Sequence, residues 1–227
     1  MIIGVCGLIS SGKGTLGDIL EDHYSFSKES FAKPLKDVAS IIFNWDRKMI
    51  EGDTKESRLW REKEDTWWTE KLGKPITPRL VLQLLGTEAG RNVFGAALWS
   101  SSLINRLDKN KDYVITDVRF ENEIKDLRKA GAFIVRVKRG SDPKWLEFAK
   151  RIKAAESDSY TPSKYSNKTY LDEFDSSMPH VHRSEWDWAN SKIDYVINND
   201  KDLAHLNNEV SRFMSWLSLQ PKRISHF

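Results

Sequence analysis

The stretch that decides the fold is GLISSGKGT, residues 7–15, which follows the apolar run IIGVC at residues 2–6. Its GxxxxGK spacing matches the Walker A pattern, and the segments on either side supply the strand-before, helix-after context that this pattern requires. The backbone amides of such a loop, together with the first turn of the next helix, form a concave site for anions. Lys13 adds a mobile positive charge for the β- and γ-phosphates of a nucleotide. The sequence therefore predicts a strand, a phosphate-binding loop and a helix, in that order.

Composition limits the class of protein. The 227 residues are 39% hydrophobic and 30% charged, which suits one domain with insertions and a sizeable core. The 36 basic and 33 acidic residues nearly balance, which argues against a general nucleic-acid-binding protein. The one cysteine, Cys6, cannot form an internal disulfide, and no apolar stretch reaches the length of a membrane span. We therefore expect a cytoplasmic protein with no membrane or nucleic-acid partner.

Strands and helices alternate along the chain. Strands are predicted at residues 2–6, 25–30, 113–116, 133–138 and 195–197. Helices are predicted at 13–22, 34–43, 97–107, 121–130 and 202–219, with a long helix beginning at Thr77-Pro78. This alternation favours an α/β fold in which helices flank a doubly wound, parallel, five-stranded sheet. Residues 1–227 are thus expected to form a single domain with two insertions. One is charge-rich, at 44–76, and is expected to cover the substrate site; the other is polar, at 140–190, and is expected to be a lid or an irregular excursion.

The residues that end the strands are candidates for chemistry, because open α/β sheets bind ligands beyond the carboxyl ends of their strands. The third predicted strand ends at Asp117-Val118-Arg119. An apolar strand that ends in Asp is the Walker B arrangement, in which the carboxylate positions Mg²⁺. The alternative is that Asp117 caps the next helix. Arg119 can clamp a phosphate, and its alternative is a surface salt bridge with Glu121 or Glu123.

The long helix carries a polar side chain at every fourth position. The stripe consists of Arg79, Gln83, Thr87 and Arg91 and is about 18 Å long. One apolar face is expected from Leu82, Leu85, Ala89 and Val93. If the nucleotide on the phosphate loop donates a phosphoryl group, the enzyme must also bind the molecule that accepts it. An acceptor monophosphate carries about two negative charges and needs its own basic clamp. Arg79, Arg91 and Lys36 are the candidates, and Gln83 can both donate and accept, which suits a base edge. The alternative is that the stripe is a solvated helix face.

Several motifs together resemble those of the bacteriophage deoxynucleoside monophosphate kinases. They follow in order along nearly the whole chain: FAKPLK at 31–36, LQLLGTE at 82–88 with Arg91, DVR at 117–119 with Glu123, VKR at 137–139, HRSE at 182–185 and VINND at 196–200. The GKGT ending of the phosphate loop is also similar to that of adenylate-kinase-like monophosphate kinases. The resemblance implies a P-loop fold of that type, which transfers the γ-phosphate of ATP, with Mg²⁺, to a deoxynucleoside 5′-monophosphate.

The resemblance also implies roles for individual residues. The donor nucleotide is expected at Ser11, Gly12, Lys13, Gly14 and Thr15, with Asn198 near the adenine and Mg²⁺ at Thr15 and Asp117. The acceptor is expected among Lys36, Arg79, Gln83, Thr87 and Arg91, with His182 and Glu185 contributing from the lid. The expected catalytic residues are Lys13, Asp117, Arg119 and Arg139.

Other functions stay open. Another small-metabolite P-loop kinase, such as a relative of dephospho-coenzyme-A kinase or gluconate kinase, would share the donor loop. A nucleic-acid-associated NTPase would need a basic stripe, and a GTP switch would need an Asn-Lys-x-Asp motif, which the NNDK sequence at 198–201 lacks.

His182 taken alone is more typical of a surface or packing residue, and His180 could replace it in the motif. Most of the nine tryptophans are expected to pack in the core or the lid. We expect small-molecule nucleotides as substrates, while the accepted base and a homodimeric state stay open.

Overall fold

The computed structural model describes residues 1–157, 181 and 183–223, and the chain divides into two compact units. Unit 1 comprises Met1–Glu29 and Leu107–Phe227, and unit 2 comprises Ser30–Arg106. Unit 1 therefore contains the predicted phosphate loop, and unit 2 contains the predicted acceptor helix.

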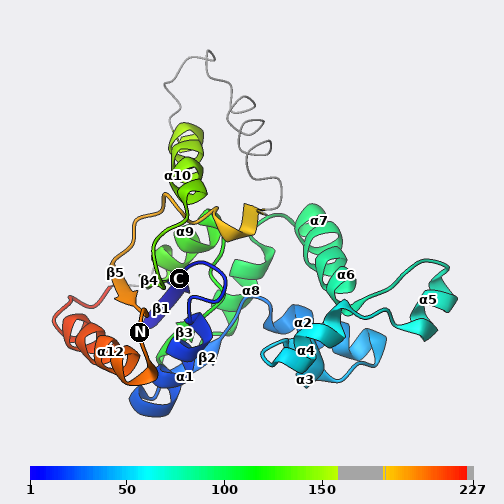
Figure 1. The fold of residues 1–227 in the computed structure, drawn as a ribbon, viewed down its shortest axis with the longest axis horizontal. Coiled ribbons are helices and arrows are strands. Elements are labelled where there is room, and N and C mark those ends of the chain that lie inside the picture. Colours follow the sequence, from blue (N-terminus) through cyan, green and yellow to red (C-terminus); the bar gives the residue numbers. More distant parts are fainter. Residues whose placement is uncertain (158–180, 182, 224–227) are drawn as a thin grey trace. The chain divides into compact units, whose positions relative to one another are not determined.

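Unit 1 is built on a sheet of five strands (Figure 1). The strands are β1 (Ile2–Cys6), β2 (Ser27–Glu29), β3 (Tyr113–Ile115), β4 (Phe133–Lys138) and β5 (Tyr195–Asn198). They lie in the order β2-β3-β1-β4-β5, and every neighbouring pair is parallel. The predicted fold class is confirmed, and the second strand is shorter than the predicted 25–30.

Helices cover both faces of this sheet. They are α1 (Lys13–Tyr24) and α12 (Leu203–Ser218) on one face and α9 (Glu121–Lys129) on the other; unit 1 also contains α10 (Lys144–Ser157) and the 3₁₀ turn η2 (Arg183–Glu185). Successive residues of a strand point to opposite faces. Ile3 packs in one core cluster with Leu20 of α1 and Phe213 of α12. Gly4 faces the other side, where a Cβ would lie 2.8 Å from Leu127 of α9. The sheet is thus doubly wound, as predicted.

Unit 2 is helical. Its helices are α2 (Lys33–Phe43), α3 (Arg47–Glu51), α4 (Lys55–Glu62), α5 (Thr66–Leu72), α6 (Pro78–Gln83), the π-helix η1 (Leu84–Arg91), α7 (Asn92–Phe94) and α8 (Leu98–Arg106). Asp46, Thr54, Asp65 and Thr77 begin α3 to α6, because each side chain accepts a hydrogen bond from a backbone amide of the first turn. The starts of these four helices are therefore fixed locally by their capping side chains.

Aromatic side chains contribute to the core of unit 2. Trp45 is buried in a cluster that Phe43 and Trp68 extend. The Trp45 indole donates to Asp65 at 2.7 Å, and the Trp68 indole donates to the Phe43 carbonyl at 3.0 Å. Because these polar atoms are satisfied internally, the rings are structural, as expected for most of the tryptophans.

The predicted long helix is not a continuous α-helix. It changes after Gln83 from α to π geometry, which returns to the α form only at α7. In a π-helix the hydrogen bond joins residues five apart, so the buried face moves by one residue per turn. The buried positions are Pro78, Val81, Gly86 and Gly90, while Ala89 and Val93 are exposed. The predicted apolar face is therefore wrong for Ala89 and Val93.

The stretch predicted to be irregular begins with a regular helix. In α10, Leu146, Ala149 and Ile152 are buried at helical spacing. The prediction of an irregular 140–190 segment is therefore wrong for its first part. Residues 158–180 lie outside the described part of the chain.

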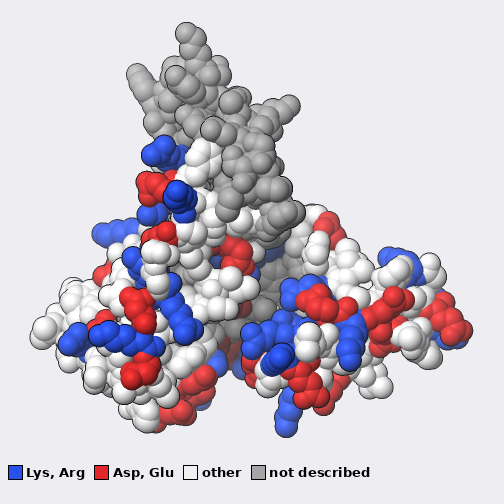
Figure 2. Space-filling view, viewed as in Figure 1, with Lys and Arg blue, Asp and Glu red and all other residues white. Residues whose placement is uncertain are grey.

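The surface carries charges of both signs. Figure 2 shows Lys and Arg side chains interspersed with Asp and Glu on the face drawn. This agrees with the near balance of charge in the sequence. Within the described residues, no helix has both the length and the hydropathy needed to cross a membrane.

Candidate active site

The phosphate loop joins the end of β1 to the start of α1 in unit 1. Gly12 is the N-cap of α1 and has a φ of 100°, a conformation that L side chains rarely adopt. Its carbonyl accepts the first helical hydrogen bond, from the Leu16 amide at 2.9 Å. Ser10 also has a positive φ, of 60°. The glycine-rich sequence thus folds into the turn that directs the first amides of α1 toward the loop.

Lys13 is held inside its own loop. Its Nζ donates to the carbonyl oxygens of Gly7 at 2.9 Å and Leu8 at 2.8 Å. Burial lowers the pKa of Lys13, and the charge of Arg119 lowers it further, while Glu185 and Asp117 act in the opposite direction. The ammonium group therefore lies within electrostatic reach of three charged side chains from other parts of unit 1.

The loop fits an anionic phosphate. The Ser11 hydroxyl oxygen is buried and, within the described residues, has no hydrogen-bond partner. Gly14 has open space where a Cβ would stand, and Thr15 is exposed at the same end of α1. Phosphate oxygens can accept from an unsatisfied hydroxyl and from helix-terminal amides. The donor residues predicted from the sequence are therefore brought together.

Asn199 supports the loop, and the sequence analysis missed it. Its side-chain nitrogen donates to the Ser11 carbonyl at 2.9 Å, and its backbone amide donates to the Lys138 carbonyl at 2.7 Å. A Cβ on Gly12 would lie under 3.0 Å from the Asn199 side chain. Asn198, the predicted residue, is exposed, whereas Asn199 is 8% exposed. The signal was the motif after the last strand, but only the pairing of β4 with β5 decides which asparagine meets the loop.

Two predicted residues follow β3. Asp117 is half-buried and lies three positions before Phe120, the N-cap of α9, so it does not cap that helix. The Glu123 carboxylate instead accepts from the backbone amides of Arg119 at 2.9 Å and Phe120 at 3.0 Å. The capping alternative for Asp117 is therefore wrong.

The Arg119 guanidinium pairs with Glu185 at 3.0 Å and donates to the Ser184 hydroxyl at 3.4 Å. Its partner is thus neither Glu121 nor Glu123, the two carboxylates proposed as its salt-bridge alternative. The contact joins two motifs that are 66 positions apart in the chain. It brings Glu185 close enough to Lys13 to affect its pKa.

A buried charge network fixes the segment that carries Glu185. Asp187 accepts from Arg183 at 2.8 Å, from the Glu121 amide at 2.9 Å and from Lys153 at 3.2 Å. Lys153 of α10 is 4% exposed and also pairs with Glu121 at 2.8 Å. Because charges in this setting are costly to leave unpaired, the network holds η2 against α9 and α10.

The residues predicted to hold a metal are Thr15 and Asp117. Among the described residues, no group of three or more His, Cys, Asp or Glu side chains could hold a metal ion. The hydroxyl of Thr15 and the carboxylate of Asp117 are oxygen donors of the kind that suits Mg²⁺, which usually keeps several waters and binds through one or two protein oxygens together with substrate phosphates.

Other predicted residues of unit 1 are placed as follows. Arg139 is exposed, directly after β4, and Asn198 is the last residue of β5. The register pairs Lys138 with Asn198, so both lie at the carboxyl edge of the sheet where the phosphate loop begins. His182 and His180 lie outside the described residues.

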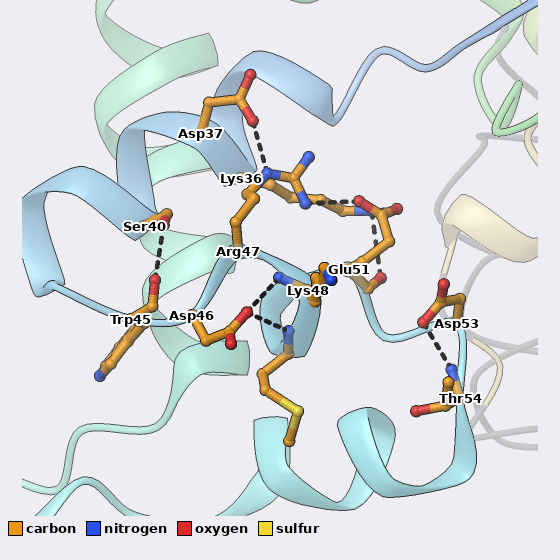
Figure 3. Close-up of polar contacts among 11 residues, drawn as sticks. Lys36, Asp37, Ser40, Trp45, Asp46, Arg47, Lys48, Glu51, Asp53 and Thr54 are labelled. Carbon is orange, nitrogen blue, oxygen red and sulfur yellow. Dashed lines mark hydrogen bonds and ion pairs between the residues drawn. The ribbon is translucent and has the colours of Figure 1, made fainter.

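The predicted acceptor residues lie in unit 2. Arg79, Gln83 and Thr87 are exposed, and Arg91 is half-buried. Arg79 forms an ion pair with Glu62 of α4. Lys36 is bound to the carboxylate of Glu51, which Arg47 also contacts at 2.6 Å (Figure 3). The structure thus places these residues on the helices of one unit.

Two curated proteins are similar in sequence to this chain. No model of a known protein family matches the chain. A protein of Acanthamoeba polyphaga mimivirus, provisionally described as a deoxynucleotide monophosphate kinase, is 29% identical over 153 residues, covering 61% of this chain and 74% of the relative. The deoxynucleoside-5′-monophosphate kinase of Escherichia phage T5 is 29% identical over 180 residues, covering 56% of this chain and 72% of the relative.

Solved structures of kinases are also similar. The dephospho-CoA kinase of Campylobacter jejuni has a TM-score of 0.44 at 17% identity, over 95% of this chain and 96% of that chain. The shikimate kinase of Bacteroides thetaiotaomicron has a TM-score of 0.43 at 12% identity, over 96% of this chain and 99% of that chain. The resemblance drawn from the motifs is confirmed by the two curated relatives. The chain therefore combines a phosphate loop on a parallel sheet with sequence similarity to viral proteins named as deoxynucleoside monophosphate kinases.

Proposed function

We propose that this chain transfers the γ-phosphoryl group of ATP to a deoxynucleoside 5′-monophosphate. The observation that carries the proposal is the phosphate loop of unit 1, where Lys13 lies within electrostatic reach of Asp117, Arg119 and Glu185. The named activity of the two curated relatives supports the choice of acceptor. In the reaction, an oxygen of the acceptor phosphate bonds to the γ-phosphorus. The bond from that phosphorus to the bridging oxygen breaks, so that ADP leaves and a deoxynucleoside diphosphate forms.

The chain contributes positioning and positive charge to this transfer. Phosphoryl transfer requires little covalent help, because its barrier is lowered mainly by alignment and by neutralising charge on the phosphoryl oxygens. Lys13 would exchange the carbonyls of Gly7 and Leu8 for phosphate oxygens. Arg119, released from Glu185, and Arg139 would supply further positive charge.

Mg²⁺ would be held by Asp117 and Thr15 together with the nucleotide phosphates, and it would neutralise charge on those phosphates. A carboxylate and a hydroxyl are oxygen donors of the kind this ion prefers.

We further propose that the acceptor binds to unit 2 through Lys36, Arg79, Gln83, Thr87 and Arg91. Cationic and amide side chains suit a phosphate and a base edge.

The proposal places the enzyme in a reducing cytoplasm, which agrees with the single free cysteine: Cys6 is buried, and burial raises its pKa to about 12.

A coupled assay tests this function. ATP, Mg²⁺ and each common or modified deoxynucleoside monophosphate are supplied in turn, and ADP release is recorded. We expect turnover with at least one of them. Lys13→Met should lower kcat at least about 100-fold, because it removes a cationic donor to the transferred group. No turnover with any monophosphate, together with phosphorylation of another small metabolite, would reject the proposal.

A further inference from the structure

One arginine of unit 2 is half-buried but has no side-chain partner for its charge among the described residues. Arg61 is in α4, and the structure gives it no hydrogen bond or ion pair with any described residue. Its Nε is shut off from solvent and has no acceptor. A guanidinium is always ionised and has five N–H donors. Burying such a donor without a partner is costly, so this position calls for an anion.

The carboxylates around Arg61 are already engaged. Glu51 accepts from Lys36 and Arg47, as Figure 3 shows, and Glu62 is paired with Arg79. Burial lowers the pKa of Arg61, and the charge of Arg79 lowers it further; Glu62 and Glu51 raise it, and Arg58 lowers it. Among the described residues, Arg61 therefore has no carboxylate partner of its own, and Glu62 and Glu51 act on it only through their charge.

A glycine leaves the space in which the Arg61 guanidinium packs. Gly52, which ends α3, has a φ of 71°, and a Cβ at this position would lie under 3.0 Å from three atoms of the Arg61 guanidinium group. The absence of a side chain at position 52 thus makes the space that Arg61 occupies. Its location is set by packing rather than by a charge partner.

On the basis of the proposed function, we propose that Arg61 binds the 5′-phosphate of the monophosphate acceptor. The phosphate of a monophosphate carries about two negative charges and has several acceptor oxygens, which match the guanidinium fork. It would accept hydrogen bonds from the terminal N–H groups of Arg61 and offset the repulsion between Arg61 and Arg79. Arg61 belongs to the same unit as the other predicted acceptor residues, whereas the phosphate loop belongs to unit 1.

The test compares Arg61→Gln with Lys63→Gln in the full chain. Lys63 is exposed, two residues further along, and the structure gives it no side-chain partner, so both changes remove one positive charge from the end of α4. Arg61→Gln should raise the KM for the acceptor at least about tenfold, as for a lost hydrogen bond to a charged group. The KM for ATP should stay unchanged, and Lys63→Gln should leave both values near those of the wild type.

A second measurement isolates the phosphate. The deoxynucleoside that matches the acceptor but lacks its phosphate is used as a competitive inhibitor. Its inhibition constant should be the same for Arg61→Gln and the wild type, because the lost contact is to the phosphate alone. An equal KM for the two glutamine variants, or an inhibition constant that rises as much as the acceptor KM, would overturn the assignment. Absence of turnover in the wild type would reject the proposed function itself.

Two glycine-to-alanine variants test the same assignment if the Arg61→Gln protein is unstable. Gly52→Ala must displace the guanidinium, whereas Gly73→Ala, at a φ of 65° and at the end of α5, meets no atom within 4 Å. Both variants carry the same backbone strain. We expect a higher acceptor KM for Gly52→Ala than for Gly73→Ala at an unchanged KM for ATP, and equal values would contradict the role of Arg61.

Discussion

Single residues at the phosphate loop show how far a sequence motif reaches. GLISSGKGT identifies the loop, Lys13 and the start of α1, because these depend on local backbone geometry. It gives no information on Asn199, which meets the loop from a distance of 188 positions along the chain. The choice between Asn198 and Asn199 requires the strand register, and the contact between Arg119 and Glu185 requires the docking of η2.

At this residue scale, we predict that Asn199→Ala weakens ATP binding. The change removes the hydrogen bond to Ser11 and the side chain that packs against Gly12. A lost bond of about 1 kcal/mol corresponds to a rise of about fivefold in the KM for ATP, with little change in the KM for the acceptor. Initial-rate kinetics with each substrate varied in turn measure both values.

Asn198→Ala is the informative comparison for this prediction. The sequence favours Asn198 as the nucleotide neighbour, whereas the structure favours Asn199 as the support of the loop. A larger rise in the KM for ATP with Asn198→Ala than with Asn199→Ala would show that the hydrogen bond to Ser11 is not what positions the loop.

At the scale of elements, the predicted bounds match the structure where the buried residues are apolar and follow a simple pattern. β1 and β4 match their predicted bounds, because most of their residues are apolar and buried. η1 was missed because its buried positions include Gly86 and Gly90, which give no hydrophobic signal. The exact fourth-residue spacing of the polar stripe was compatible with an ordinary α-helix.

The π-helix makes a testable packing prediction. A Cβ on Gly90 would lie 2.8 Å from both the Leu85 carbonyl oxygen and the Trp99 ring, while one on Gly86 would meet only the flexible end of Leu35 at 3.0 Å. Gly90→Ala should therefore lower the free energy of unfolding by about 1–3 kcal/mol, the usual cost of overpacking. Gly86→Ala should cost less, because Leu35 can rotate away.

Urea unfolding of the two alanine variants, followed by circular dichroism, measures this difference. The wild type provides the reference slope for the extrapolation to water. If Gly86→Ala proved the more destabilising variant, the packing of Trp99 against η1 would not be what limits position 90.

At the scale of the whole molecule, one carboxylate connects distant parts of unit 1. Asp194 is 5% exposed in its side chain and accepts from the Ile134 amide at 2.7 Å, from Arg223 at 2.8 Å and from Arg128 at 3.2 Å. Burial opposes its ionisation, but the hydrogen bonds from Arg223 and Ile134 and the charge of Arg128 outweigh burial and lower its pKa. Asp194 therefore joins β4, α9 and the last described residues.

This arrangement predicts how stability depends on pH. A carboxyl whose pKa is lower in the folded state stabilises the fold above its unfolded pKa, about pH 4, and loses this effect as the pH falls through the folded value. Asp194→Asn should lower the free energy of unfolding by about 2 kcal/mol at pH 7, less than for fully buried pairs because the arginines are partly exposed. The difference from the wild type should shrink below about pH 4.

Urea unfolding between pH 7 and pH 3 measures the effect. Asp112→Asn is the matched control, because Asp112 is exposed and pairs only with the amino terminus among the described residues. A constant difference between wild type and Asp194→Asn down to the lowest pH would contradict the assignment of the effect to ionised Asp194.

The strand order has a consequence for how the molecule is made. The partners of β1 are β3 and β4, which begin at Tyr113 and Phe133, so a nascent chain leaves the ribosome with its first strand unpaired. All of unit 2 is synthesised before either partner exists. Because contacts so distant in sequence form late and slowly, the nucleotide site is completed only after most of the chain has been translated.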